Sequence, residues 1–374
     1  MKNVENADII VFDDIYPDNK SLFREIEFNE YLKMDCDIKI VTSNPDFNTR
    51  SDQYNNYFGQ NPSNINKIVS YDENTFYSAK LAYVVFFSNL VKFDLGYSIK
   101  IPFIVNLYPG GQFQINNIEC DELYKKYFFS PYLRKVIVTQ KLTYDYLVDN
   151  HLCPVEKIEH IFGVVLSNYN DKIISKKYFS IDKEVLDVCF VAYKYSSNGI
   201  DKGFDTFIEV SKLLAHKYNN IRFHVVGNFS ENDIDISEIQ DRIIFWGTQK
   251  GEWFDEFYAD KDIIVSPTEP FILSKGSFDG FPTASVSEAS IRNVAMIVTD
   301  KLNLNDNRFE KDNEIVITNN DAHEIAKKIE FFYHNPKELA VLADKGCQKS
   351  RYIYSKQNQF PVCLSHGSSS GSVP

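Results

Sequence analysis

Short runs of apolar residues alternate with amphipathic segments along the first half of the chain. These runs occupy residues 7–12, 37–42, 81–87, 102–107 and 135–139. Strands that are apolar at every position are typical of a parallel sheet that is covered by helices on both faces. The pattern therefore predicts a doubly wound α/β domain in this half of the chain.

The same pattern begins again after a hydrophilic stretch at residues 167–184. Further apolar runs follow at 188–192, 222–227, 242–246, 262–266, 295–299 and 314–318, and helices are expected at 204–217, 252–259, 283–291 and 322–333. We expect an α/β protein with two doubly wound, Rossmann-like domains that face a cleft, because such sheets bind ligands at the carboxyl ends of their strands. The expected domains are residues 1–166 and 167–350, and the small, polar residues 365–374 are expected to form a flexible tail.

The densest group of candidate functional residues is DGFPTASVSEAS, residues 279–290. A Gly-Phe-Pro turn leads into a helix there, and the free backbone amides of its first turn, residues 283–285, are suited to bind a diphosphate. Glu288, about one turn further, could accept hydrogen bonds from ribose hydroxyls, and Asp279 could reach a sugar. The spacing is equally compatible with an ordinary capped helix that carries a solvated glutamate.

A second group lies in the loop SSNGIDKGFDTF, residues 196–207, between an apolar run and a helix. Lys202 is placed where an ammonium could neutralise a phosphate that leaves a sugar, and Lys194 could be a second cation. Because Lys-Gly before a helix is common, solvated surface lysines are the alternative interpretation.

In the first domain, the segment LYPGGQF, residues 107–113, follows an apolar run. Its Gly110 and Gly111 allow either a close approach of the backbone to a ligand or simply a tight turn. No Gly-x-Gly-x-x-Gly pattern follows a strand, which disfavours a dinucleotide cofactor. The sequence also contains no phosphate-loop, zinc-protease or serine-hydrolase pattern.

Charge and composition narrow the class of partner. The chain of 374 residues has 52 acidic residues against 40 Lys and Arg, a net charge of −12, which argues against nucleic-acid binding because cations neutralise a phosphate backbone. The six cysteines are scattered without a Cys-x-x-Cys pair, which favours a reducing compartment. With no signal peptide and no apolar stretch long enough to span a bilayer, we expect a cytoplasmic protein.

Taken together, these segments resemble the retaining, nucleotide-sugar-dependent glycosyltransferases of the GT-B fold, in the group 1 or family 4 superfamily. FVAYKYSSNGIDKGFDTFIEV resembles that family's strand, basic loop and Lys-Gly helix, and FHVVGN resembles the next strand and Gly turn. IIFWGTQKGEWFDEFYADKDIIVSP and FDGFPTASVSEAS resemble the base-pocket segment and the acidic donor motif. The resemblance covers residues 135–345 well and the first 130 residues only by pattern.

The resemblance implies a nucleotide-sugar-binding site in the second domain. Lys202 and Asp279 would be catalytic, the first by binding the leaving diphosphate and the second by orienting the transferred sugar. Glu288 would hold the ribose, and residues 247–249 would border the nucleobase. Donor binding as a whole would involve Lys194, Gly203, Gly227, Gly247, Thr248, Gln249, Gly280, Phe281, Pro282, Thr283, Ala284, Ser285 and Glu288. The acceptor would lie near Tyr108, Gly110 and Gly111 of the first domain, to which residues 351–364 would cross back.

The chain departs from the family pattern at three points. Asp279 and Glu288 have eight residues between them instead of the usual seven, and the first of the pair is Asp instead of Glu. Tyr108 follows the strand at which many members carry His-Gly. The Arg that usually follows the first strand of the second domain is absent, since Tyr193 stands there and Lys194 comes next.

The expected reaction transfers a hexose from a UDP- or GDP-sugar to an acceptor hydroxyl with retention of configuration (EC 2.4). Neither a metal nor another cofactor is expected, because lysines supply the positive charge. The resemblance alone implies a glycan or glycolipid acceptor in surface polysaccharide or glycoconjugate synthesis. Membrane contact is expected to be at most peripheral, through the basic aromatic stretch 124–135, whose alternative is a solvated helix face with a buried aromatic side. A GT-B sugar-nucleotide epimerase and a non-catalytic GT-B partner subunit stay open as alternatives.

Overall fold

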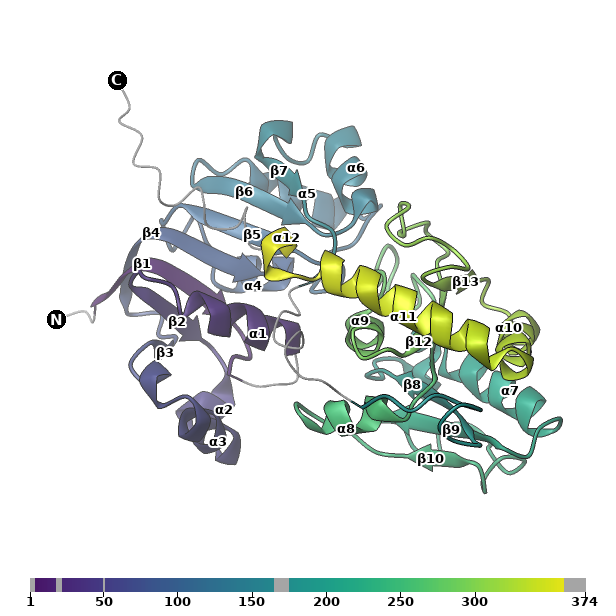
Figure 1. Cartoon of the computed structure of the whole chain (residues 1–374). Coiled ribbons are helices and arrows are strands. Elements are labelled where there is room, and N and C mark those ends of the chain that lie inside the picture. Colours follow the sequence, from purple (N-terminus) through teal and green to yellow (C-terminus); the bar gives the residue numbers. More distant parts are fainter. Residues whose placement is uncertain (1–3, 18–21, 50, 165–174, 360–374) are drawn as a thin grey trace. The chain divides into compact units, whose positions relative to one another are not determined.

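The chain divides into two compact units (Figure 1). Unit 1 comprises Met1–Ser167 together with Ser355–Pro374, and unit 2 comprises Asn168–Tyr354. The computed structural model describes four stretches of the chain, residues 4–17, 22–49, 51–164 and 175–359. Residues 365–374, for which the sequence predicted a flexible tail, lie outside the described stretches.

Unit 1 contains a seven-stranded sheet whose described neighbours are all parallel. Its order is β3-β2-β1-β4-β5-β6-β7, with β1 at Val4–Asp13, β2 at Ile38–Thr42, β3 at Ile68–Ser70, β4 at Phe76–Val85, β5 at Phe103–Leu107, β6 at Leu133–Val138 and β7 at Ile158–His160. The five apolar runs of the first half are confirmed as β1, β2, β4, β5 and β6. The strands β3 and β7 were not predicted, since three residues are too few to show a pattern.

The helices of unit 1 are α1 (Leu22–Tyr31), α2 (Pro45–Asn48), α3 (Asp52–Gln60), α4 (Phe87–Lys92), α5 (Ile118–Phe128), α6 (Lys141–Asp149) and α12 (Lys356–Gln359), with short 3₁₀ turns at Pro62–Asn64 and Val155–Lys157. The last of them, α12, is held by a hydrogen bond of 2.9 Å from Gln359 Nε2 to the carbonyl oxygen of Phe162. An ion pair of 2.6 Å between Lys356 and Glu30 adds a second contact within the unit.

The basic aromatic stretch that begins at residue 124 forms the end of α5. Tyr124, Tyr127 and Phe128 are buried, whereas Lys125 and Lys126 are exposed. The helix begins at Asn117, whose side chain accepts hydrogen bonds from two backbone amides of the first turn, as is typical of a cap. The structure therefore confirms the plainer of the two interpretations, a solvated helix face with a buried aromatic side.

Unit 2 contains a parallel sheet of six strands. Its order is β10-β9-β8-β11-β12-β13, with β8 at Leu186–Val191, β9 at Ile221–Val226, β10 at Ile243–Phe245, β11 at Ile263–Ser266, β12 at Ala295–Thr299 and β13 at Val316–Thr318. Each strand coincides with an apolar run of the second half. The predicted fold class, α/β with two doubly wound Rossmann-like domains, is confirmed for both units.

The helices of unit 2 cover both faces of its sheet. They are α7 (Phe204–Ala215), α8 (Trp253–Ala259), α9 (Ala284–Ser290), α10 (Ala322–His334) and α11 (Pro336–Ile353). Side chains alternate between the faces of a strand, and Ile297 of β12 joins the core formed with α7 and α10. Its neighbour Met296 contacts Gly346 of α11. The sequence predicted every one of these helices except α11.

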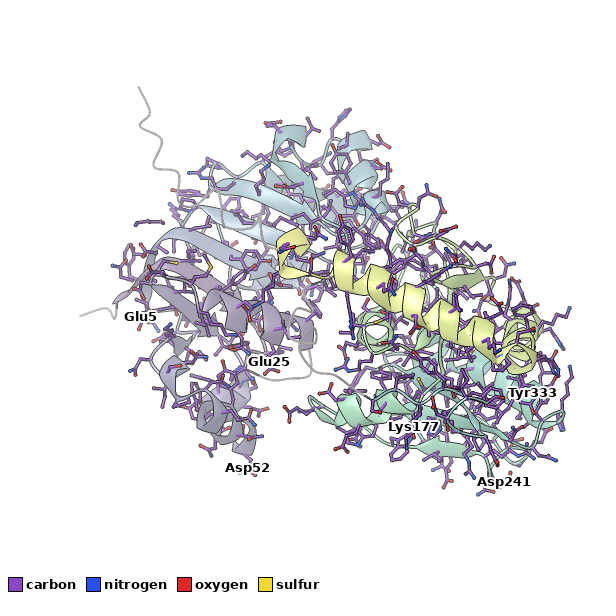
Figure 2. All side chains as sticks on the ribbon, in the orientation of Figure 1. Glu5, Glu25, Asp52, Lys177, Asp241 and Tyr333 are labelled. Carbon is purple, nitrogen blue, oxygen red and sulfur yellow. The ribbon has the colours of Figure 1, made fainter. Side chains whose placement is uncertain are left out.

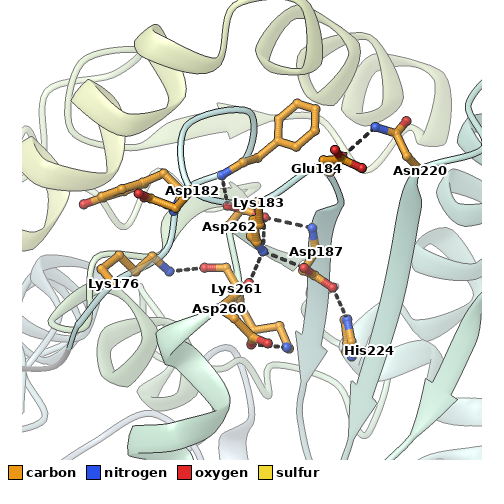
Figure 3. Close-up of polar contacts among 12 residues, drawn as sticks. Lys176, Asp182, Lys183, Glu184, Asp187, Asn220, His224, Asp260, Lys261 and Asp262 are labelled. Carbon is orange, nitrogen blue, oxygen red and sulfur yellow. Dashed lines mark hydrogen bonds and ion pairs between the residues drawn. The ribbon is translucent and has the colours of Figure 1, made fainter.

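A buried polar network lies at the amino-terminal ends of β8 and β11 (Figure 3). Lys183 Nζ lies 2.5 Å from Asp187 Oδ2 and 2.7 Å from Asp262 Oδ2. Asp187 also pairs with His224 Nε2 at 2.7 Å, and burial lowers the pKa of that imidazole. These buried polar groups are paired and hydrogen-bonded, as buried polar groups usually are. They lie at the amino edge of the sheet, whereas ligand chemistry is expected at the opposite, carboxyl edge.

Charged side chains extend from both units, among them Glu5 and Asp52 of unit 1 and Lys177 and Asp241 of unit 2 (Figure 2). The α11 helix has 18 residues and carries charged side chains along its length. No helix in the described stretches is long and apolar enough to cross a membrane.

Candidate active site

Lys202 and Asp279 meet at the carboxyl edge of the unit 2 sheet. Lys202 ends the 3₁₀ segment Ser197–Lys202 in the loop that follows β8. Its Nζ donates a hydrogen bond of 2.5 Å to Asp279 Oδ2 and lies 5.2 Å from the centre of the Tyr195 ring. The Lys202 side chain is 11% exposed and that of Asp279 is 32% exposed. Lys202 is therefore not the solvated surface lysine of the alternative interpretation.

The close packing of two loops explains how Lys202 is held. The residue after it, Gly203, has a φ of +71°, which favours glycine. A Cβ at Gly203 would overlap the carbonyl oxygen of Pro267, in the loop that follows β11. The same two loops are joined by a hydrogen bond of 3.2 Å from the backbone amide of Glu269 to the carbonyl oxygen of Asp201.

An open pocket lies at the carboxyl ends of β11 and β12. Five residues of the predicted site line it, namely Asp279, Gly280, Phe281, Pro282 and Thr283. It is also lined by polar residues at the ends of the two strands that were not predicted, among them Ser266, Thr268, Thr299, Asp300 and Lys301. All of these lie at or just after the end of an apolar run, so the strand-end rule could have identified them.

Two of these additional residues have local partners. Both carboxylate oxygens of Asp300 accept backbone hydrogen bonds, from Leu304 at 2.7 Å and Asn305 at 2.9 Å. Lys301 pairs with Glu269. We therefore expect them to shape the pocket wall.

Glu288 lies in α9 and is 8% exposed. Burial raises the pKa of its carboxyl group to about 7, an effect that the Arg292 guanidinium opposes. No described residue donates a hydrogen bond to this carboxylate; Arg292 bonds instead to the Glu288 carbonyl oxygen, at 2.8 Å, and to Asp255. The alternative of a solvated glutamate is therefore wrong, and a buried carboxylate that lacks a hydrogen-bond donor is expected to have a ligand or water as its partner.

The start of α9 differs from the expectation by one residue. Thr283 is the extended residue before the helix, and Ala284 is its first helical residue. The backbone of Thr283 has a ψ of +157°, so it is not part of the first turn. Thr283, Ala284 and Ser285 are half-buried, and the Thr283 and Ser285 hydroxyls lie 3.2 Å apart.

Lys194 is directed toward a different partner from Lys202. Its Nζ lies 2.6 Å from Asp233 Oδ1, and its backbone amide donates a hydrogen bond of 2.6 Å to the side chain of Asn228. No contact joins Lys194 to Lys202 or to Asp279 in the described stretches. The structure therefore does not place the Lys194 ammonium next to that of Lys202.

The turns after β9 and β10 lie side by side. The Gly227 amide donates a hydrogen bond of 2.9 Å to the Gly247 carbonyl oxygen, and a Cβ at Gly227 would overlap the carbonyl oxygen of Ala192. Thr248 is exposed, and Gln249 bonds through its side-chain amide to the Trp246 carbonyl oxygen at 2.7 Å. The predicted base-side residues therefore occupy the same sheet edge as the loop after β8.

In unit 1, the predicted acceptor-side residues follow β5. Tyr108 is buried, and its hydroxyl accepts a hydrogen bond of 3.3 Å from Asn106. The Gly110 carbonyl accepts a 2.9 Å hydrogen bond from Phe113, which closes a tight turn, and a Cβ at Gly111 would overlap the Phe86 ring. The tight turn is therefore present, and the approach of a ligand to Gly110, which has open space beside it, stays a prediction.

A charged cluster that was not among the predicted site residues lies at the end of β1. Asp13 is fully buried, and burial raises the pKa of its carboxyl group. Arg24 pairs with Asp13 at 2.9 Å and with Asp14 at 2.7 Å. Two adjacent aspartates directly after an apolar run were the available signal. Among the residues that the structure describes, no group of three or more His, Cys, Asp or Glu side chains could hold a metal ion.

Comparison with known proteins supports the resemblance that the sequence predicted. Residues 190–349 match the model of a family described as glycosyl transferases group 1. This match lies within unit 2 and contains Lys202, Asp279 and Glu288. The chain matches none of the curated proteins searched.

Solved structures share the fold across both units. HepE from Anabaena has a TM-score of 0.66 at 13% identity, over 94% of this chain and 97% of its own. A glycosyltransferase from Rickettsia africae has a TM-score of 0.62 at 13% identity, over 94% and 95% of the two chains. Sucrose-phosphate synthase from Thermosynechococcus elongatus has a TM-score of 0.60 at 12% identity, over 93% and 95%. At these identities the likeness establishes the two-domain GT-B fold.

Proposed function

We propose that this chain, whose residues 190–349 match the group 1 glycosyltransferases, transfers a hexose from a nucleoside diphosphate sugar to an acceptor hydroxyl with retention of configuration. The observation that carries the proposal is the Lys202–Asp279 pair, which borders a pocket at the carboxyl edge of the unit 2 sheet. The buried Glu288 carboxylate belongs to the same predicted donor motif.

UDP is the nucleotide with the best support. HepE has been crystallised with UDP and with UDP-glucose, and TarM from S. aureus with UDP. In the proposed complex, Glu288 accepts hydrogen bonds from the ribose hydroxyls and residues 247–249 border the base. Hydrogen bonds to a charged acceptor are worth about 1.5–3 kcal/mol each, so Glu288 would contribute strongly to nucleotide affinity.

The proposed chemical step breaks the bond between the anomeric carbon and the diphosphate oxygen. Negative charge develops on that oxygen, and the Lys202 ammonium stabilises it. The acceptor oxygen bonds to the anomeric carbon on the face that the diphosphate leaves, and its proton passes to the departing phosphate. In the proposed complex, Asp279 orients a sugar hydroxyl or the positively charged sugar ring. Because a lysine supplies the positive charge, we propose a reaction that needs no metal or other cofactor.

A glycan or glycolipid is the proposed acceptor class, an assignment that rests on the family resemblance. A role in surface polysaccharide or glycoconjugate synthesis rests on the same basis. The proposed donors are cytoplasmic metabolites, which supports a cytoplasmic or membrane-peripheral location.

Calorimetry with UDP and GDP, followed by transfer assays in excess EDTA, tests the proposal. Binding of one nucleotide and metal-independent transfer are expected. Failure to bind either nucleotide would favour a non-catalytic subunit. Conversion of a nucleotide-sugar into its epimer, in the absence of any acceptor, would favour an epimerase.

A further inference from the structure

Two tyrosines with exposed rings lie side by side in the loop after β8. The side chains of Tyr193 and Tyr195 are 50% and 65% exposed, and their ring centres are 5.1 Å apart with an angle of 51° between the planes. Neither hydroxyl has a hydrogen-bond partner in the stretches that the structure describes. Large aromatic side chains gain free energy from burial, so a pair that stays exposed in one short loop needs an explanation.

The residue between the two tyrosines fixes their placement. The Lys194 backbone amide bonds to the Asn228 side chain at 2.6 Å, and the Asn228 amide bonds back to the Lys194 carbonyl oxygen at 3.2 Å. The Lys194 ammonium pairs with Asp233. These contacts hold Lys194 between the two tyrosines, whose rings pack against each other.

The pair adjoins the proposed reaction centre. The Lys202 ammonium lies 5.2 Å from the centre of the Tyr195 ring and 2.5 Å from Asp279 Oδ2. Asp279 also lines the pocket. One lysine therefore contacts both the Tyr195 ring and a residue that lines the pocket, and the Tyr193 ring adjoins that of Tyr195.

The chemistry of this surface suits a sugar ring. The face of an aromatic ring carries partial negative charge, which attracts the polarised C–H groups on one face of a pyranose. The free hydroxyls of the tyrosines can exchange hydrogen bonds with sugar hydroxyls. A nucleobase could also stack on such rings, but the proposed site places the base at residues 247–249.

We propose that Tyr193 and Tyr195 form a stacking platform that holds a hexose ring beside Lys202. The proposal rests on the glycosyltransferase function proposed above and adds a sugar subsite to it. The ring belongs either to the donor or to the acceptor, and both sources share the same chemistry.

The test compares a double Tyr→Ala variant with a double Tyr→Phe variant at these positions. Phe331→Ala, which removes an exposed aromatic ring from α10 in the same unit, is the matched control. Calorimetry measures the affinity of each variant for UDP and for one UDP-sugar. That sugar is whichever of UDP-glucose, UDP-galactose and UDP-N-acetylglucosamine binds the wild type most tightly. Methyl glucoside is measured in the presence of UDP by saturation-transfer NMR, and thermal unfolding checks that each variant folds.

We expect UDP alone to bind the double Phe variant and Phe331→Ala as it binds the wild type. The double Ala variant should lose less affinity for UDP than for its sugar probe, since Tyr195 also contacts Lys202. The double Ala variant should bind one sugar probe about tenfold more weakly, the value expected for two aromatic contacts. The double Phe variant and Phe331→Ala should keep the wild-type affinity for that probe. A lower affinity for the UDP-sugar assigns the platform to the donor, and a lower affinity for methyl glucoside assigns it to the acceptor. Unchanged affinity for both probes overturns the platform alone, whereas a wild type that binds no UDP and no UDP-sugar overturns the proposed function as well.

Discussion

The ammonium of Lys202 donates a hydrogen bond to Asp279 across 2.5 Å, although the two residues are 77 positions apart in the sequence. The pair joins the loop after β8 to the loop before α9. A bound diphosphate would compete with Asp279 for the Lys202 ammonium, because both are anions that accept from the same donor. Removing the Lys202 ammonium is therefore expected to weaken nucleotide binding, whereas removing the Asp279 charge is not.

Replacing Lys202 by Ala should lower kcat by about 10²–10³-fold, because it removes the charge that stabilises the leaving group. Lys202→Arg should recover only part of the rate, since a planar guanidinium differs in shape from an ammonium. Lys194→Ala is the control, because Lys194 is held by Asp233 and its loss should affect kcat less. Steady-state transfer kinetics measure all three, and a near-normal kcat for Lys202→Ala contradicts the assignment.

Asp279→Asn should leave UDP affinity unchanged or raise it by up to about fivefold, since it removes the anion that competes for Lys202 in a half-exposed ion pair. The rate of sugar transfer should nevertheless fall, because the carboxylate that orients the sugar is lost. Calorimetry and kinetics on the same preparation separate the two effects. Weaker UDP binding would instead show that Asp279 contacts the nucleotide.

Nucleotide affinity should depend on the ionisation of Glu288. Since the pKa of its carboxyl group is raised to about 7, the charged form that accepts from ribose is lost as the pH falls through 7. UDP should therefore bind less tightly at pH 6 than at pH 8. Glu288→Gln should bind more weakly at pH 8 and change less with pH than the wild type in calorimetric titrations, because the phosphate of UDP also titrates in this range. A wild-type affinity that does not change with pH argues against the ribose contact.

Gly203→Ala should destabilise unit 2 more than Gly247→Ala does. Both residues have a positive φ, +71° and +66°, which costs an alanine about 1–2 kcal/mol. Only at Gly203 would the new methyl group also overlap backbone, at Pro267, because Gly247 has open space around it. Overlap of this kind adds about 1–3 kcal/mol. Urea unfolding compares the two variants, and equal losses would mean that the loop moves aside.

The stability of unit 1 should fall as the pH rises toward 8. Burial raises the pKa of Glu27 from its ordinary value of 4.5 to about 7, although Tyr31 and Tyr83 donate hydrogen bonds to it. Between these values the folded state holds a proton that the unfolded state releases. The free energy of unfolding therefore decreases across that window, by at most about 3 kcal/mol.

Glu27→Gln should remove this part of the pH dependence and raise stability at pH 8. Denaturant unfolding at pH 4.5, 6 and 8 measures it, with Glu122→Gln on the exposed side of α5 as the surface control. If the free energy of unfolding changes equally with pH in the wild type and in Glu27→Gln, other groups cause the pH dependence.

The sequence by itself determined the class of fold and the identity of the main candidate residues. A strand buried on both faces is apolar at nearly every position, so β8, β9, β11 and β12 were visible locally. Lys202 was visible because it stands in a loop that follows such a run, and Asp279 because it precedes a Gly-Phe-Pro turn that leads into a helix. Three-residue strands such as β3 and β7 carry too little pattern for that reasoning.

Only the tertiary structure decided which of these groups meet and what charge they carry. The pairing of Lys202 with Asp279, and of Lys194 with Asp233, depends on loops that are distant in sequence. Gly203 is needed because Pro267 approaches it, which no local pattern records. The pKa values of Glu27 and Glu288 are raised because packing removes water from carboxylates that, on a helix considered alone, would be solvated.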